Sequence, residues 1–266
     1  MIRLVAADLD GTIINASGIC DPSVPAAVRK LRQAGVAFAI CSGRPVASIT
    51  GLLAGWHLEG EIDYLIGSGG GEVLDMKTGR MVVPYLLDVP LIREIIDLYE
   101  PEGLIPTMYE GAMFYAQKIT PQVQVVADRV GQEVREGDIR TLTVKPQIKV
   151  MFVLNPEDMA AAEEFERAHR DPRYIGFRTA PDLLEFNDAR LNKDTGLAIA
   201  AEMMGITAGE IMAFGDTTND IAMLRYAGTG ICMANGTQDA MDAADDIAPS
   251  VDEQGFARYV RAHILK

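Results

Sequence analysis

The sequence has few of the residues that build disulfide frameworks, zinc sites or transition-metal sites. Three cysteines and three histidines are scattered through 266 residues: Cys20, Cys41, Cys232, His57, His169 and His263. This spacing favours neither a disulfide framework nor a Cys-based zinc site, and it indicates a reducing compartment. A histidine-ligated transition metal is not expected either.

Basic residues are also scarce. Lys and Arg number 24 against 38 Asp and Glu, so the formal net charge is −14. Binding to nucleic acid or to an anionic membrane needs a basic face, so we expect neither partner. An anionic substrate in a locally positive pocket stays compatible with this charge.

Long apolar runs are missing as well. No stretch reaches about 18 apolar residues, which argues against a membrane-spanning helix. The apolar run that follows Met1 ends at Asp8, too early for the core of a signal peptide. We therefore expect a cytoplasmic protein, and its oligomeric state is unknown from the sequence.

The length and composition are those of a globular chain with one large domain or two modest ones. The 28.8 kDa chain is 48% hydrophobic and 23% charged. Apolar runs predict strands over 2–7, 36–41, 63–66, 210–214 and 230–233. Helical periodicity predicts helices over 24–34, 45–53, 197–204, 221–227 and 255–265. Alternation of strands and helices predicts an α/β fold, a Rossmann-like parallel-sheet core.

The pattern changes in the middle of the chain, where we predict an inserted α+β domain. Helices are expected over 91–99 and 156–169, and extended chain over 107–117 (a hairpin about Glu110-Gly111), 149–154 and 174–186. Pro84 and Asn187-Asp188 are the expected hinges. The predicted domains are a catalytic core of residues 1–83 and 189–266, and an inserted domain of residues 84–188.

Two acids follow the first predicted strand. Residues two apart in extended chain share a side, so Asp8 and Asp10 are expected to share one while Leu9 points to apolar packing. In open parallel sheets the ligand crevice lies at the carboxyl ends of strands, where this pair falls. Neighbouring carboxylates suit both proton transfer and Mg²⁺ binding. An acidic loop that caps a helix is the alternative for an isolated pair.

The second predicted strand is followed by Ser42, Gly43 and Arg44. A hydroxyl and free backbone N–H groups before a helix can hold an anion, although the same residues also suit an ordinary turn. Further on, Lys193 precedes a predicted helix, where a cation opposes the helix dipole. A lysine that reaches into an anion site explains this position, and a solvated surface lysine is the alternative.

A fourth segment follows the strand over 210–214. Asp216 leaves the strand end as Asp8 does, and Asn219 and Asp220 lie in the first turn of the next helix. Helix capping accounts for Asp220. It accounts less well for Asp216, because an acid next to a core strand is desolvated.

These four segments resemble the motifs of haloacid-dehalogenase-type phosphatases of the Cof-like subfamily. Asp8 to Thr12 is similar to the first motif, Ser42 to Arg44 to the second, Lys193 to the third and Gly215 to Asp220 to the fourth. The order and spacing match across the whole chain, and the insert resembles the family's larger α+β cap. The chain departs from the usual pattern at Gly69 to Gly71, at Asp194 and at Thr217, which surround the expected pocket.

The resemblance implies a role for each residue. Asp8 would be the nucleophile that forms an aspartyl-phosphate, and Asp10 the general acid and base. Mg²⁺ would be held by the Asp8 carboxylate, the Asp10 backbone carbonyl and Asp216. The phosphate would be bound by Leu9, Ser42, Gly43, Lys193 and Asn219. Supporting roles would fall to Thr12, Arg44 and Asp220, the last orienting Lys193 or a metal-bound water.

The expected function is therefore hydrolysis of small phosphate monoesters, such as a sugar phosphate, by a Mg²⁺-dependent phosphatase. Two alternatives are a sugar phosphomutase and a non-enzymatic, Asp-phosphorylated signalling domain. The substrate is a small phosphorylated metabolite whose identity the motifs do not reveal. We expect the insert to be a moving cap that selects it, with Tyr109, Glu110, Tyr115 and Arg178 as candidate contacts.

Overall fold

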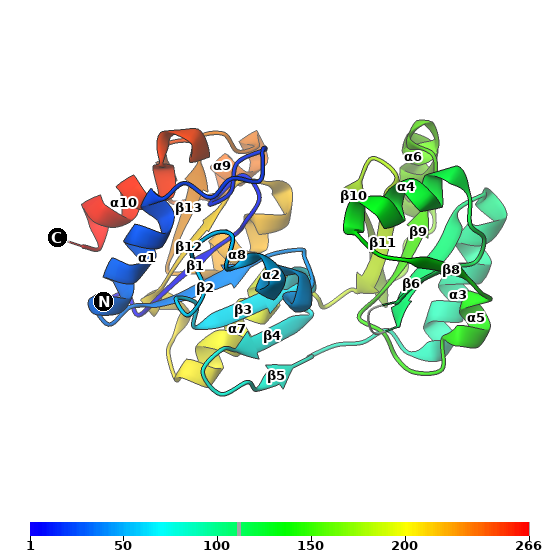
Figure 1. The fold of residues 1–266 in the computed structure, drawn as a ribbon, viewed down its shortest axis with the longest axis horizontal. Helices are drawn as coiled ribbons and strands as arrows, with labels where there is room; N and C mark the ends of the chain where they lie inside the picture. The colour runs from blue at the N-terminus through cyan, green and yellow to red at the C-terminus, as the bar shows by residue number, and fades with distance from the viewer. Residues whose placement is uncertain (111–112, 266) are drawn as a thin grey trace. The chain divides into compact units, whose positions relative to one another are not determined.

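The structure is a computed structural model that describes residues 1–110 and 113–265. The chain divides into two compact units. Unit 1 comprises Met1–Pro84 and Leu191–Lys266, and unit 2 comprises Tyr85–Arg190. The chain colours in Figure 1 show that the first and last segments belong to the same unit.

Unit 1 is built on an eight-stranded sheet. In spatial order its strands are β14 (Asp246–Ala248), β13 (Thr229–Met233), β12 (Ile211–Gly215), β1 (Leu4–Ala7), β2 (Ala37–Cys41), β3 (Tyr64–Gly67), β4 (Glu72–Asp75) and β5 (Met81–Val82). The pairs from β14 to β3 are parallel, and β4 and β5 add an antiparallel edge. The sequence analysis did not predict this edge.

Helices cover both faces of this sheet. One face carries α1 (Ser23–Gln33), α2 (Val46–Leu52) and α10 (Gly255–His263). The other carries α7 (Lys193–Met204), α8 (Ile221–Tyr226) and α9 (Gln238–Ala243). Strand β1 is fully buried because its side chains alternate between these two apolar layers. The predicted α/β fold with a parallel-sheet core is confirmed.

Unit 2 is built on a six-stranded sheet that is antiparallel except for one pair. Its strands are, in spatial order, β10 (Tyr174–Ala180), β11 (Leu183–Asp188), β9 (Lys149–Val153), β6 (Ile105–Glu110), β7 (Met113–Ala116) and β8 (Val134–Glu136). One face packs against α3 (Val89–Tyr99), α5 (Ile139–Leu142) and α6 (Met159–Ala168). The other packs against α4 (Pro121–Val130).

One detail of the insert differs from the sequence-based expectation. Asn187 and Asp188 were expected in a hinge, but they are the last residues of β11 and pair with β10. The pairing of β6 with β7 gives the expected hairpin. Its turn, predicted at Glu110-Gly111, falls partly outside the described residues.

Short 3₁₀ turns connect several elements. They are η1 (Ser68–Gly70), η2 (Glu100–Glu102), η3 (Pro156–Asp158), η4 (Ala208–Glu210), η5 (Thr218–Asp220) and η6 (Val251–Glu253). Across residues 1–110 and 113–265, no helix has both the length and the apolar character needed to cross a bilayer.

Candidate active site

The acids that the sequence analysis singled out lie at the carboxyl ends of neighbouring parallel strands. Strand β1 lies between β12 and β2, with Ala7 in register with Phe214 on one side and Ile40 on the other. Asp8 directly follows β1, and its backbone N–H donates to the Phe214 carbonyl at 2.9 Å. Asp216 follows β12 and Ser42 follows β2, so all three leave the same edge of the sheet.

The loop after Asp8 turns sharply. The Leu9 carbonyl accepts hydrogen bonds from Thr12, Ile13 and Ile14 at 2.9–3.2 Å, and the Leu9 side chain is fully buried in the core, as predicted. Gly11 has a φ of +91°, which favours glycine. A Cβ at this position would lie 2.1 Å from Asp216 Oδ2. Gly11 therefore makes room for the Asp216 carboxylate.

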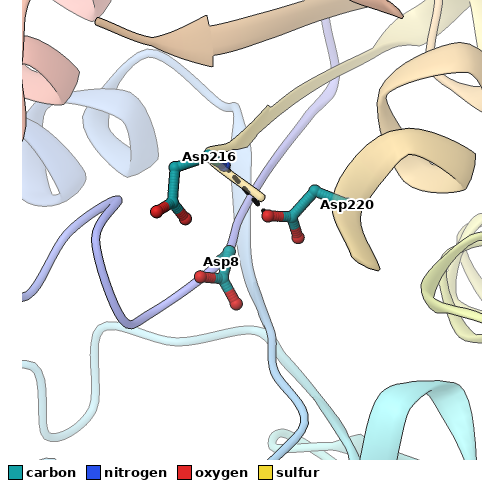
Figure 2. A group of neighbouring side chains, drawn as sticks. All are labelled: Asp8, Asp216 and Asp220. Carbon is teal, nitrogen blue, oxygen red and sulfur yellow. Dashed lines mark hydrogen bonds between the residues drawn. The ribbon is translucent and has the colours of Figure 1, made fainter. Parts of the chain in front are cut away.

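Three carboxylates and one lysine form a buried cluster behind this loop. Lys193 Nζ donates to Asp8 Oδ1 at 2.6 Å and to Asp220 Oδ1 at 2.5 Å. The other Asp220 oxygen accepts from the backbone N–H groups of Asp216 at 2.9 Å and Thr217 at 3.0 Å. Figure 2 shows the Asp8, Asp216 and Asp220 side chains gathered in one place. We call Asp8, Lys193, Asp216 and Asp220 the buried quartet.

The quartet explains why a lysine begins helix α7, against the helix dipole. Although burial opposes the charged form, the carboxylates of Asp8 and Asp220 raise the pKa of Lys193 above its usual value. Lys193 is only 3% exposed, so the alternative of a solvated surface lysine is excluded. The helix begins at Lys193 itself, four residues before the start at residue 197 that the sequence pattern predicted.

Burial also shifts the titration of two acids. Desolvation raises the pKa of Asp8 to about 7, with Lys193 opposing the shift and Asp220 adding to it. Desolvation and the nearby Asp220 raise the pKa of Asp216 to about 6, with a hydrogen bond from Thr12 opposing. Ionising all three acids of the quartet together is therefore unfavourable without a further positive charge.

The chemistry of the quartet fits a divalent cation. Its three carboxylates and one ammonium sum to a charge of −2 when all are ionised. One oxygen from each acid lies within 4.8 Å of the others. Asp220 already has both oxygens engaged, whereas Asp8 and Asp216 each keep one oxygen outside the described hydrogen bonds. An all-oxygen set of this kind suits a hard cation such as Mg²⁺.

Two side chains outside the quartet shape it. Thr12 is 1% exposed, and its hydroxyl donates to Asp216 Oδ1 at 3.1 Å. Asn235 Nδ2 donates to the Gly11 carbonyl at 2.8 Å and so holds the loop. The sequence analysis missed Asn235. Its position just after strand β13, at the same sheet edge, was the available signal.

The predicted phosphate-binding groups are placed at the same edge. Ser42 follows β2 and is 2% exposed. Among the described residues, the backbone N–H groups of Leu9 and Gly43 have no hydrogen-bond acceptor. Asn219 is exposed in η5, and its Oδ1 accepts from the Thr217 hydroxyl at 2.8 Å, which leaves the amide N–H groups of Asn219 outside the described hydrogen bonds. Asp10 is not part of the quartet, and its carboxylate pairs with Arg44 instead.

The four predicted substrate contacts of unit 2 do not form one site. Tyr109 belongs to the face of the sheet that packs on α4, whereas Tyr115 belongs to the opposite face. Arg178 is also on that opposite face, since it is opposite Leu184 and lines a hollow beside α6. The side chain of Glu110 lies outside the described structure.

Other polar residues share the face of Tyr109. Strands β9 and β11 place Lys149, Glu185 and Asn187 on the same face as Tyr109. The residues that alternate with them along these strands belong to the core on the opposite face. Lys149 Nζ lies 3.0 and 3.1 Å from the Glu185 oxygens, and Asn187 Oδ1 is buried without a hydrogen-bond partner. Burial and the Glu185 carboxylate raise the pKa of Tyr109 to about 12. The sequence analysis did not identify Lys149, Glu185 or Asn187 as functional candidates.

Comparison with known proteins gives a match over nearly the whole chain. The model of the haloacid dehalogenase-like hydrolase family matches residues 5–260. A 5-amino-6-(5-phospho-D-ribitylamino)uracil phosphatase of Bacillus subtilis, YcsE, is 26% identical over 265 residues, covering 99% of this chain and 96% of the relative. A phosphoglycolate phosphatase of Methanospirillum hungatei is 24% identical and covers 100% of this chain and 99% of the relative.

A solved structure shows the same fold. The crystal structure of a haloacid dehalogenase-like hydrolase from Bacteroides thetaiotaomicron has a TM-score of 0.85 and 25% sequence identity. The match covers 98% of this chain and 99% of that one. Together the matches support phosphatase activity, so the alternative of a non-enzymatic signalling domain is wrong.

Proposed function

The chain belongs to the family of haloacid dehalogenase-like hydrolases, and on that premise we propose that it is a Mg²⁺-dependent phosphatase of small phosphate monoesters. The reaction passes through an aspartyl-phosphate on Asp8. The observation that carries this proposal is the contact between Lys193 and a single oxygen of the buried Asp8 carboxylate. That contact fixes the carboxylate and leaves its second oxygen available to attack.

Asp8 is the nucleophile. Its free oxygen attacks phosphorus, and the bond from phosphorus to the ester oxygen breaks. Forming a covalent intermediate divides one difficult displacement into two easier ones. Lys193 holds the attacking carboxylate in place and offsets part of the charge that gathers around it.

Asp10 carries the proton in both steps. In the first step its carboxyl group gives a proton to the departing ester oxygen. In the second step the resulting carboxylate takes a proton from the water that attacks phosphorus, and Asp8 is released. General acid–base catalysis of this kind contributes roughly 10²- to 10⁴-fold. Asp10 is exposed, in contrast to Asp8, and can therefore exchange its proton with solvent.

Mg²⁺ would be held by the Asp8 carboxylate, the free carboxylate oxygen of Asp216 and the Asp10 backbone carbonyl. The hydrogen bonds of the loop use the carbonyls of Leu9 and Ile14 and leave that of Asp10 available. When bound, the cation supplies the positive charge that lets an anionic carboxylate approach an anionic phosphoryl group. Asp220 orients Lys193 and the backbone of Asp216 rather than binding the metal itself.

The phosphoryl oxygens bind to groups that this chain already directs to the sheet edge. They are the Ser42 hydroxyl, the backbone N–H groups of Leu9 and Gly43, Lys193 and the Asn219 amide. Hydrogen-bond donors that the fold already holds in place need little reorganisation energy when charge shifts during the reaction. None of these groups recognises what the phosphate is attached to.

Unit 2 selects the substrate. Its sheet face with Tyr109, Lys149, Glu185 and Asn187 offers a phenol, an ammonium, a carboxylate and a buried amide oxygen. Hydroxyl-rich molecules such as sugars and polyols are recognised by groups of this kind, which donate and accept hydrogen bonds. The proposed substrates are therefore polyhydroxylated phosphate monoesters.

Phosphate release from a panel of sugar, polyol and nucleoside phosphates tests the proposal. We expect Mg²⁺-dependent release that a chelator abolishes and added Mg²⁺ restores. Asp8→Asn keeps the shape but removes the attacking charge, so turnover should vanish while the fold survives. Full activity in a metal-free sample would refute the metal role, and turnover by Asp8→Asn would refute the covalent route.

A further inference from the structure

Asp10 does not stand free in solvent, because the Arg44 guanidinium binds both of its carboxylate oxygens. Arg44 Nε donates to Asp10 Oδ2 at 2.9 Å, and a terminal nitrogen donates to Oδ1 at 2.6 Å. This two-point geometry sets both the position and the plane of the carboxylate. The pair stays accessible, since the side chains are 38% and 53% exposed.

The backbone of Arg44 is itself fixed on both sides. Its N–H donates to the Ser42 hydroxyl oxygen at 3.2 Å, and its carbonyl accepts from the Ser68 N–H at 2.9 Å. Ser68 has a φ of +51°, an uncommon conformation for a residue other than glycine. The surrounding contacts hold this strained turn against Arg44.

Glu72 ties the two loops together. Its Oε2 accepts from the Val46 N–H at 3.0 Å, at the start of α2, and from the Ser68 hydroxyl at 2.8 Å. The loops approach closely, because a Cβ on Gly67 would lie 2.6 Å from Val46 N and 2.9 Å from the Arg44 carbonyl oxygen. The buried end of strand β3 therefore fixes the backbone from which the Arg44 side chain extends.

We propose that Arg44 is the positioning residue of the proton carrier Asp10, and that the Ser68–Glu72 turn is its support. The inference rests on the proposed function, in which Asp10 transfers the proton. A short acidic side chain that is half exposed would otherwise sample several rotamers. A displacement of about 1 Å can cost on the order of 100-fold in rate.

Arg44 acts through Asp10 in both half-reactions. One Asp10 oxygen keeps its N–H contact with the guanidinium while the other gives a proton to the departing ester oxygen. After the leaving group has gone, the same oxygen takes a proton from the attacking water. Arg44 itself gains and loses no proton, and the bonds that form and break at phosphorus are those of the proposed reaction.

The test compares two substrates that differ in their need for a proton. The leaving group of a polyol phosphate is an alkoxide, which needs a proton from the acid. The leaving group of 4-nitrophenyl phosphate is a stable phenolate, which does not. In Arg44→Met, single-turnover release should slow by roughly 10- to 100-fold for the polyol and by less than about threefold for nitrophenolate. Because Asp10 also activates the attacking water less well in this variant, the release of nitrophenolate should show a burst followed by slow turnover.

A mutant cycle separates positioning from other roles. If Arg44 acts through Asp10, Arg44→Met should change the rate of Asp10→Asn by less than about threefold. Arg44→Lys should recover part of the rate, and Glu72→Gln should show a weaker form of the same leaving-group effect. Arg32→Met is the matched control, since Arg32 pairs with Glu61 and Asp63 at the opposite ends of the strands. It should leave both substrates unaffected.

The inference is overturned if Arg44→Met slows both substrates equally, or if its effect adds fully to that of Asp10→Asn. Either result would assign Arg44 to binding or to stability. Failure of the proposed function looks different. In that case the wild-type protein would form no phosphorylated Asp8, and Asp10→Asn alone would show no leaving-group effect.

Discussion

Mg²⁺ binding should depend steeply on pH, because the two carboxylates proposed as its ligands are hard to ionise in the metal-free protein. Burial raises the pKa of Asp8 to about 7 and that of Asp216 to about 6, each from a usual value of 3.8. The cation needs both groups deprotonated, so it must displace protons wherever the pH lies below these values.

The size of the effect follows from the two pKa values. Relative to pH 8, protonation at pH 5 should weaken Mg²⁺ binding by about 100-fold through Asp8 and about 10-fold through Asp216. Together this is on the order of 1,000-fold, or roughly 4 kcal/mol. Between pH 7 and 8 the affinity should change only about twofold, because Asp216 is then largely ionised and Asp8 is already half ionised at pH 7.

In the metal-free protein, stability should change with pH in the opposite direction to Mg²⁺ affinity. Both groups have raised pKa values in the folded state, so their contribution to the free energy of unfolding is present at about pH 4 and is lost as the pH rises through 6 and 7. Mg²⁺ reverses this loss, since it neutralises the ionised pair. Its stabilising effect should therefore be small at pH 5 and large at pH 8.

Titration calorimetry and thermal unfolding between pH 5 and 8 measure both effects. At pH 6, calorimetry in two buffers of different ionisation enthalpy should detect protons released on Mg²⁺ binding. Asp10→Asn is a matched control, because only its backbone carbonyl is assigned to the metal and the pH dependence should persist. A dissociation constant that stays constant from pH 5 to 8, or binding without proton release, would refute the reasoning.

Three further predictions follow from the same geometry. Gly11→Ala places a Cβ against the Asp216 carboxylate at a positive φ, so Mg²⁺ affinity and activity should both fall by at least about tenfold, and unchanged affinity would contradict the close approach. Asp220→Asn leaves Lys193 with an amide in place of a buried charge and should cost roughly 3–5 kcal/mol in urea unfolding. Asp239→Asn, at an exposed acid that accepts from the Thr218 hydroxyl, should cost far less, and equal losses would contradict the role of burial. Replacing unit 2 by a short linker should reduce discrimination among large substrates far more than hydrolysis of a small activated phosphate, and a core that kept the parent ranking would place specificity in unit 1.

The sequence predicted the positions of the acids well, because those positions follow from local rules. An acid that directly follows a buried parallel strand lies at the carboxyl edge of the sheet, and both Asp8 and Asp216 do. The alternation of side chains along extended chain also placed Leu9 correctly in the core. What the pattern did not reveal is that Asp8 and Asp10 have different partners, Lys193 and Arg44, from distant segments.

The remaining features depend on contacts that no local pattern encodes. Glu72 reads as an ordinary acid in a short edge strand, and only the folded chain brings it to the start of α2. Strands β4 and β5 are only four and two residues long, which gives periodicity little to detect. In unit 2, Tyr109 and Tyr115 look equivalent in sequence, yet their places in adjacent strands put them on opposite faces of the sheet.

The acidity of the whole chain and the anionic nature of the proposed substrate are reconciled by the local charge of the site. The quartet alone carries −2 when all its groups are ionised, so it would then repel a phosphate dianion at close range even though Lys193 is present. A divalent cation at the proposed ligands Asp8 and Asp216 would bring the quartet to neutrality, and Ser42 and the backbone N–H groups would then attract phosphate without opposition. In the proposed mechanism the requirement for a cation would therefore arise before any bond is broken, because the three buried acids around the proposed nucleophile would otherwise exclude its substrate.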